Sequence, residues 1–123
     1  MKLSVLDGLY SVCRLGPRDS LPAWIDRGGF WTITRTSDEL SVVCLQAGVP
    51  SDVRAEKDWR ILQVQGPLDF GLTGVLASLA VPLAEAEISI FSVSTFDTDY
   101  LLVKDEKIEK ARQSLEQKGF TFV

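Results

Sequence analysis

Alternating apolar and polar residues in the first part of the chain predict two pairs of β-strands. Residues 2–6 and 9–15 are rich in leucine and β-branched side chains, and the Asp7-Gly8 dipeptide between them suits a two-residue hairpin turn. Residues 30–34 and 40–45 repeat this pattern around a polar turn at 36–39. We therefore expect two hairpins.

A short helix is expected between the two hairpins, over residues 21–26. Asp19 or Ser20 can act as its N-cap, and Pro22 falls early in the helix, where a missing N–H costs little. Gly28 and Gly29 follow and would end it. The first half of the chain is then ββαββ.

A polar stretch at residues 46–58 separates this half from the next. It contains Gly48, Pro50 and a charged run from 54 to 58, a composition typical of a connection between domains. We place the boundary here, which predicts domains at residues 1–57 and 58–123.

The second half predicts the order β-α-β-β-α-β. Strands are expected at residues 59–65, 88–95, 100–103 and 120–123. The first helix has apolar residues at positions 75, 76, 79, 80 and 83, which share one face, and Pro82 should kink or split its last turn. Asp105 is expected to cap the second helix, which has an apolar face at 108, 111 and 115 and is closed by Gly119. This α+β order is typical of an antiparallel sheet with both helices on one face.

The length and composition fit one domain or two very small ones. The chain has 123 residues, of which 46% are hydrophobic, and a net charge of −4. The basic residues are scattered, which argues against binding to nucleic acid or to an anionic membrane surface. No segment approaches the ~20 apolar residues of a membrane span, and the N-terminus does not have the pattern of a secretory signal. We expect a cytoplasmic protein.

The chain contains no histidine. This removes Ser/His and Cys/His catalysis, the usual zinc sites and the commonest general base. Cys13 and Cys44 lie inside predicted strands without a partner at metal-ligand spacing, so we interpret both as buried residues with free thiols. We expect no enzyme, no metal and no cofactor.

A glycine-rich stretch marks the junction between the strand ending at residue 65 and the helix that follows. Its residues are Asp69, Phe70, Gly71, Leu72, Thr73, Gly74 and Val75. Unpaired N–H groups and the dipole at a helix N-terminus suit a carboxylate, and glycines let a ligand approach closely. A tight turn capped by Thr73, with no ligand, explains the same residues. A phosphate loop is excluded because residues 66–74 contain no lysine or arginine.

A second polar cluster lies in the turn before the strand at 100–103. Its candidate residues are Ser94, Thr95, Phe96, Asp97 and Asp99. Carboxylates, hydroxyls and an aromatic ring can hold an ammonium or guanidinium group through charge-assisted hydrogen bonds and cation–π contact. Asp and Thr are also ordinary turn residues. Catalysis by Asp97 and Asp99 is less favoured, because acid-base pairs usually lie in a buried cleft rather than on a hairpin turn.

Residues 59–123 resemble an ACT domain, and in detail the CASTOR-type ACT proteins, which include the cytosolic arginine sensors and small bacterial relatives. The matching pieces are residues 70–75, 83–90 and 94–103, of which the last is the most specific. The first half matches loosely. The resemblance implies a ferredoxin-like ACT domain, βαββαβ, preceded by a divergent ACT-like ββαββ half.

The same resemblance implies an amino-acid site where the loop and helix start meet a strand of a neighbouring unit. Gly71, Thr73, Gly74 and Val75 would hold the backbone groups of the ligand. Thr95, Phe96 and Asp99 would face its side chain.

A homodimer is implied as well, because the chain is about half the length of an arginine sensor. Ile88, Ser89 and Ile90 of one subunit would then lie near the site of the other. The arginine sensors carry an acidic group inside the loop where this chain has Gly71-Leu72. The acid near this position here is Asp69, so arginine itself does not follow from the resemblance.

Taken together, the two motifs favour a non-catalytic regulatory or sensor module that binds a small amino acid and acts as a homodimer. The alternative is a protein-interaction or oligomerisation domain with no ligand, in which the same motifs are only turns.

Overall fold

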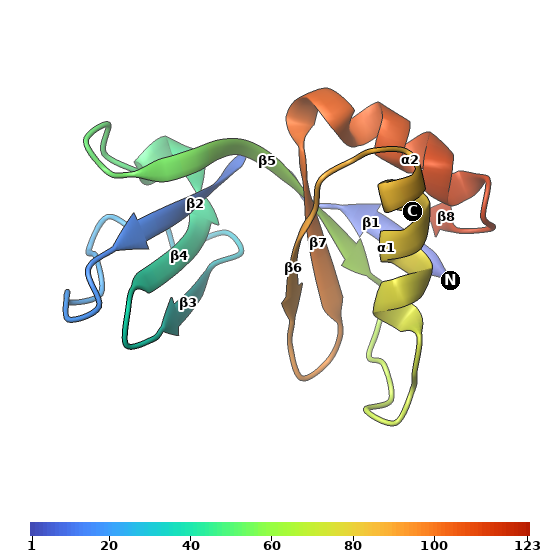
Figure 1. Cartoon of the computed structure of the whole chain (residues 1–123), viewed down its shortest axis with the longest axis horizontal. Helices are drawn as coiled ribbons and strands as arrows, with labels where there is room; N and C mark the ends of the chain where they lie inside the picture. The colour runs from blue at the N-terminus through green and yellow to red at the C-terminus, as the bar shows by residue number, and fades with distance from the viewer. The chain divides into compact units, whose positions relative to one another are not determined.

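The computed structural model describes residues 1–123 as an α+β protein with eight β-strands and two α-helices (Figure 1). The chain divides into two compact units. The smaller unit is Gly8–Trp59, and the larger unit combines Met1–Asp7 with Arg60–Val123. Strand β5 (Ala55–Val64) begins in the smaller unit and ends in the larger one.

In the larger unit, five strands pair in the order β8-β1-β5-β7-β6. The second part of β5 is joined by β1 (Lys2–Val5), β6 (Phe91–Ser94), β7 (Asp99–Lys104) and β8 (Thr121–Phe122). Strand β1 is antiparallel to β5 and parallel to β8, whereas β6 is antiparallel to β7. The sheet is therefore mixed, and the prediction of a purely antiparallel sheet is wrong.

The position of β1 corrects a second prediction. β1 does not pair with the strand that follows it, so the hairpin expected across Asp7-Gly8 is not formed. Leu3 is fully buried and lies opposite Val64 on β5 and Phe122 on β8. Burial of Leu3 in the core of the larger unit outweighs the local turn preference of Asp7-Gly8.

Both helices belong to the larger unit and bury the apolar faces that their spacing predicts. They are α1 (Val75–Glu85) and α2 (Ile108–Glu116), which contact each other. The buried helical residues of the core are Val75, Leu79 and Leu83 on α1, and Ile108, Ala111 and Leu115 on α2. α1 continues through Pro82 to Glu85, so the helix is not split there.

The smaller unit is an antiparallel sheet in the order β3-β4-β2-β5. Its strands are β2 (Tyr10–Leu15), β3 (Thr32–Arg35), β4 (Leu40–Leu45) and the first part of β5. The hairpin of β3 and β4 confirms the prediction. Cys13 and Cys44 are free and buried in the core of this unit, as expected, and a hydrogen bond to Cys13 together with burial raises the pKa of the Cys44 thiol.

The helix predicted over residues 21–26 is not formed, so the first half of the chain is not ββαββ. Six residues are too few to offset helix nucleation, and Leu21 precedes a proline, which disfavours helical geometry. Ile25 is buried in the core of the smaller unit, and Asp26 accepts a hydrogen bond from the Gly28 N–H at 2.9 Å. Side-chain burial and a local turn therefore shape this segment.

Candidate functional site

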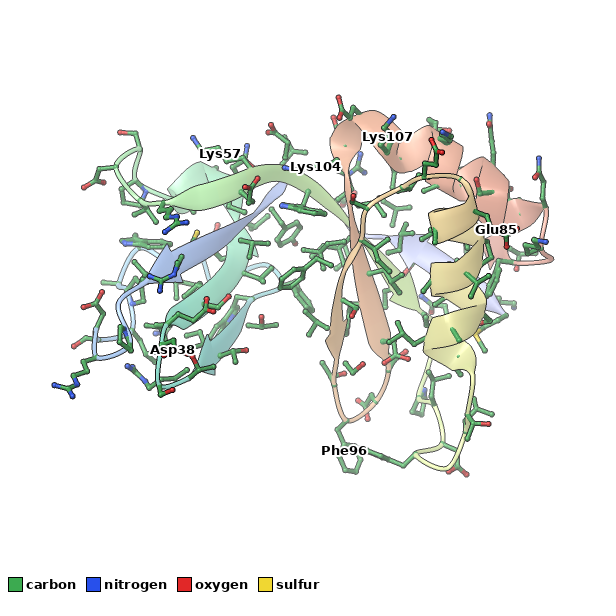
Figure 2. All side chains as sticks on the ribbon, in the orientation of Figure 1. Asp38, Lys57, Glu85, Phe96, Lys104 and Lys107 are labelled. Atoms are coloured by element: carbon green, nitrogen blue, oxygen red, sulfur yellow. The ribbon has the colours of Figure 1, made fainter.

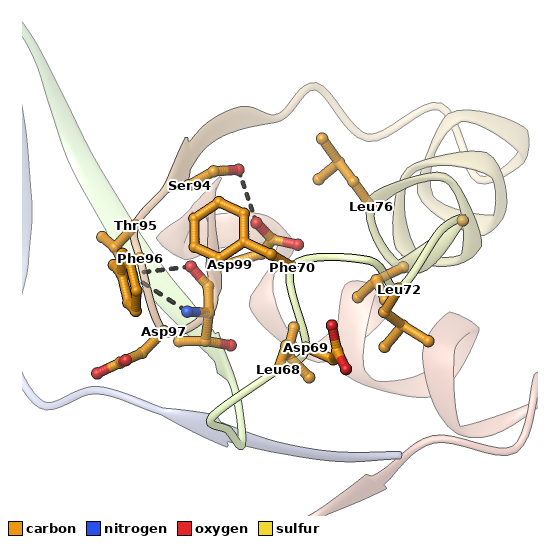
Figure 3. Close-up of a pocket in the computed structure, with 13 residues that line it drawn as sticks. Leu68, Asp69, Phe70, Leu72, Leu76, Ser94, Thr95, Phe96, Asp97 and Asp99 are labelled. Atoms are coloured by element: carbon orange, nitrogen blue, oxygen red, sulfur yellow. Dashed lines mark hydrogen bonds between the residues drawn. The ribbon is translucent and has the colours of Figure 1, made fainter.

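A cavity of about 220 Å³ lies in the larger unit between the loop before α1 and the turn that joins β6 to β7 (Figure 3). Residues from both sequence motifs line it. The predicted site residues in its lining are Asp69, Phe70, Leu72, Gly74, Val75, Ser94, Thr95, Phe96, Asp97 and Asp99. The fold thus brings together two motifs that are about 20 residues apart in the chain.

Other predicted residues lie outside this lining. Gly71 and Thr73 belong to the same loop but do not line the cavity. Ile88 is buried in the core of its own unit, and Ile90 packs against that core. Ser89 is exposed between them.

Three lining residues were not predicted, namely Leu68, Leu76 and Thr98. Leu76 could have been identified from the sequence as a lining residue, since it belongs to the apolar face of the predicted helix. Leu68 directly precedes the glycine-rich stretch. Thr98 gave no such signal, because a threonine in a turn is usually exposed, whereas this one is only 5% exposed.

The loop before α1 is shaped by Asp69. One carboxylate oxygen of Asp69 accepts a hydrogen bond from the Gly71 N–H at 2.8 Å, and its carbonyl accepts one from the Leu72 N–H at 3.0 Å. These bonds form a tight turn with Phe70 inside it. The Phe70 side chain is therefore presented at the mouth of the cavity, as Figure 3 shows.

Helix α1 begins at the cavity without a side-chain cap. The N-cap is Gly74, in the left-handed region at φ 77°, and not Thr73 as the ligand-free interpretation of the sequence assumed. The Ser78 N–H donates to the Gly74 carbonyl at 2.9 Å, and the first turn carries no acidic residue. The N–H groups and positive dipole end of α1 are thus not neutralised by a side chain, which suits a carboxylate.

The turn opposite is held by hydroxyl groups. Thr98 donates its hydroxyl hydrogen to the Val64 carbonyl at 2.7 Å, which anchors the turn to β5. Thr95 donates a hydroxyl hydrogen bond to the Thr98 carbonyl at 3.0 Å. The Ser94 hydroxyl donates to Oδ1 of Asp99 at 2.6 Å, which orients that carboxylate beside the cavity (Figure 3).

The charges around the cavity are all negative. Asp69, Asp97 and Asp99 contribute carboxylates, and no lysine or arginine lines it. The start of α1 supplies the complementary positive pole. Asp97 and Asp99 belong to the β6–β7 side of the cavity and face the start of α1, whereas Asp69 lies in the loop that leads into that helix. Two carboxylates opposite a helix N-terminus suit a zwitterion.

The chain offers no grouping of three or more His, Cys, Asp or Glu residues suited to a metal ion. None of its helices is both long enough and apolar enough to cross a membrane.

The comparisons with known proteins agree with this fold. The ACT domain family model matches residues 54–117, and the family model of an N-terminal domain matches residues 8–52. The chain belongs to the ACT domain family.

Two individual proteins show which members of the family the chain resembles. Over 61 residues the chain is 38% identical to the cytosolic arginine sensor for mTORC1 subunit 1 of Homo sapiens, a match that covers 49% of this chain and 18% of the sensor. The match thus spans about a fifth of that relative's length. The crystal structure of protein Atu0741 from Agobacterium tumefaciens has a TM-score of 0.94 and 45% identity, covering 99% of this chain and 91% of that one.

A more distant structure shares the fold alone. Aspartate kinase of Clostridium acetobutylicum has a TM-score of 0.66 and 12% identity, covering 94% of this chain and 34% of the kinase.

Proposed function

We propose that the protein binds a free amino acid in the cavity between α1 and the β6–β7 turn, and that it acts as a regulatory or sensor module without catalysis. The observation that carries this proposal is the uncapped N-terminus of α1, which lies at the same cavity as the carboxylates of Asp97 and Asp99. A cavity lined by carboxylates and by the positive end of a helix favours a ligand that carries one positive and one negative charge. The names of the relatives, an arginine sensor and an aspartate kinase, are consistent with amino acids as a ligand class.

The ligand carboxylate would lie at the start of α1, near Gly74 and Val75. Its cationic group would face Asp99, with Thr95 and the ring of Phe96 beside it. The volume of about 220 Å³ is below the usual range of pockets for drug-sized ligands, which favours a ligand as small as a single amino acid.

We propose that the functional form is a cytoplasmic homodimer. The exposed Ser89 and the half-buried Ile90 are the residues of segment 88–90 that remain available to reach the site of a second subunit, since Ile88 is used by its own core. The measurement is the mass in solution, by light scattering. A dimer has twice the 13.6 kDa of one chain.

Isothermal titration against each of the twenty amino acids tests the ligand class. We expect one or a few small amino acids to bind, and Gly74→Trp to abolish the binding, because an indole at the N-cap would fill the space beside α1. Absence of heat from all twenty at millimolar concentration would contradict the proposal.

A protein-interaction domain without a ligand is the second candidate. The observation that favours it is the exposure of three large apolar side chains, Phe70, Leu72 and Phe96, at the mouth of the cavity. Under this alternative, Gly74→Trp would retain partner binding and no amino acid would affect the wild type.

A further inference from the structure

Two phenylalanine rings meet across the mouth of the cavity. Phe70 comes from the loop before α1 and Phe96 from the β6–β7 turn, and their ring centroids are 4.9 Å apart at an interplanar angle of 66° (Figure 3). Figure 2 shows Phe96 at the far end of its turn. The two residues are 74% and 80% exposed. Large aromatic side chains are seldom this exposed, so the position of these two rings indicates a role other than packing in the core.

The two segments are held together below the rings. The Leu68 N–H donates to the Asp97 carbonyl at 2.7 Å, and the buried Thr98 ties the turn to β5. Each turn also has internal hydrogen bonds, through Asp69 in the loop and Thr95 in the turn. The base of the cavity is therefore fixed, whereas the ring pair joins the outer ends.

The contact between the rings is weak. An edge-to-face aromatic pair favours the closed arrangement by a factor of about 2 to 13, and exposure places this pair toward the lower value. The open arrangement is then populated in roughly 7% to 30% of molecules. Rotation of exposed side chains is fast, so the mouth can open without any change in the fixed base.

We propose that Phe70 and Phe96 form a lid that parts to admit the ligand and closes over it. This inference rests on the proposed amino-acid site. The closed rings cover the mouth of the cavity beside the half-buried Asp99, and a less polar surrounding strengthens the attraction between a carboxylate and the cationic group of the ligand. The two rings are thus positioning residues that control how long a ligand stays.

The test uses the full chain with 4-fluorophenylalanine at position 96, followed by ¹⁹F NMR, and each of the twenty amino acids as probe. In the ligand-free protein, Phe70→Ala should shift the fluorine signal, because the ring of Phe70 lies against it. For any amino acid that raises the melting temperature, Phe70→Ala should raise the dissociation rate about 5- to 10-fold and the association rate about threefold or more, the inverse of the open fraction. Leu21→Ala, at a half-exposed leucine of the smaller unit, is the control and should change neither rate.

The rise of both rates distinguishes a lid from a simple contact. A faster dissociation with an unchanged association rate would mean that Phe70 only touches the ligand, and would overturn the lid. A change in oligomeric mass in Phe70→Ala would overturn it too, because the rings would then be a subunit interface.

The proposed site and the lid can also fail separately. An amino acid that raises the melting temperature but leaves the fluorine signal unchanged would overturn the lid alone. If none of the twenty raises the melting temperature, the amino-acid site and the lid are overturned together.

Discussion

Asp99 is oriented before any ligand arrives, because Ser94 donates a hydrogen bond of 2.6 Å to its carboxylate. A side chain that already has its binding geometry loses less conformational entropy on binding. Asp99 is the first residue of β7, directly after the turn, and its side chain is only half-buried, so its contribution to binding can be measured apart from folding.

Asp99→Ala is expected to weaken amino-acid binding by roughly 10- to 100-fold, the usual value of a hydrogen bond to a charged group, and to leave the fold intact. The measurement is titration calorimetry together with thermal unfolding. Asp38→Ala, at an exposed acid in the smaller unit, is the control. Equal affinities in the Asp99→Ala protein and the wild type would mean that the cationic group of the ligand lies elsewhere.

Thr98→Val should lower the free energy of unfolding by about 1–3 kcal/mol, because the buried Val64 carbonyl loses its hydrogen-bond donor. Urea denaturation checks this, with the exposed Thr121→Val as the control. A variant as stable as the wild type would show that Thr98 does not anchor the turn.

The two motifs could be recognised from the sequence as candidate binding segments, because glycines before a helix and acids in a turn have recognisable chemistry. The anchoring role of Thr98 could not. Thr98 lies in the turn and donates its hydrogen bond to the carbonyl of Val64, which lies 34 positions earlier, on β5. A pattern within a short window does not contain that contact.

Among the elements, α1 and β1 show what the spacing of apolar residues can predict. It predicts the buried face of a helix, but not the partner of a strand. The spacing of apolar residues predicted the buried face of α1, because a helix makes its own hydrogen bonds and only its face needs a partner. A strand needs a neighbour, and the sequence pattern does not say which one. β1 was therefore recognised as a strand but paired with the wrong partner.

Leu3→Ala is expected to destabilise the protein by about 2–5 kcal/mol, since Leu3 is fully buried on β1, between β5 and β8. Lys2→Ala, at the exposed neighbouring position, should change stability by less than about 0.5 kcal/mol. Urea denaturation of both variants measures the difference. If the two substitutions lowered the free energy of unfolding equally, β1 would not be part of the core sheet in solution.

At the scale of the whole molecule, the domain boundary between residues 57 and 58 stays a proposal, and it can be tested by cutting the chain there. A chain of residues 58–123 lacks β1, which lies between β5 and β8 in the larger sheet. We expect this piece to unfold at lower urea concentration than the full chain, and residues 1–7 joined to residue 60 by a glycine-serine linker to restore much of the loss. Far-ultraviolet circular dichroism in urea measures the unfolding of the piece and of the linked variant. A piece as stable as the full chain would support an independent domain at 58–123.

The parallel pairing of β1 with β8 also determines when the larger unit can form during protein synthesis. The register joins Lys2 to Thr121, almost the whole length of the chain apart. The strands of the smaller unit, in contrast, pair among residues 10–59 and can assemble while the ribosome is still adding the rest. β1 can pair with β5 once residues 55–64 have been made, but its other partner, β8, follows only with residues 121–122, and such long-range pairing is intrinsically slow. The edge of β1 that receives β8 therefore stays unpaired through most of the synthesis of this chain, and a chaperone that protects it would prevent wrong strand pairing.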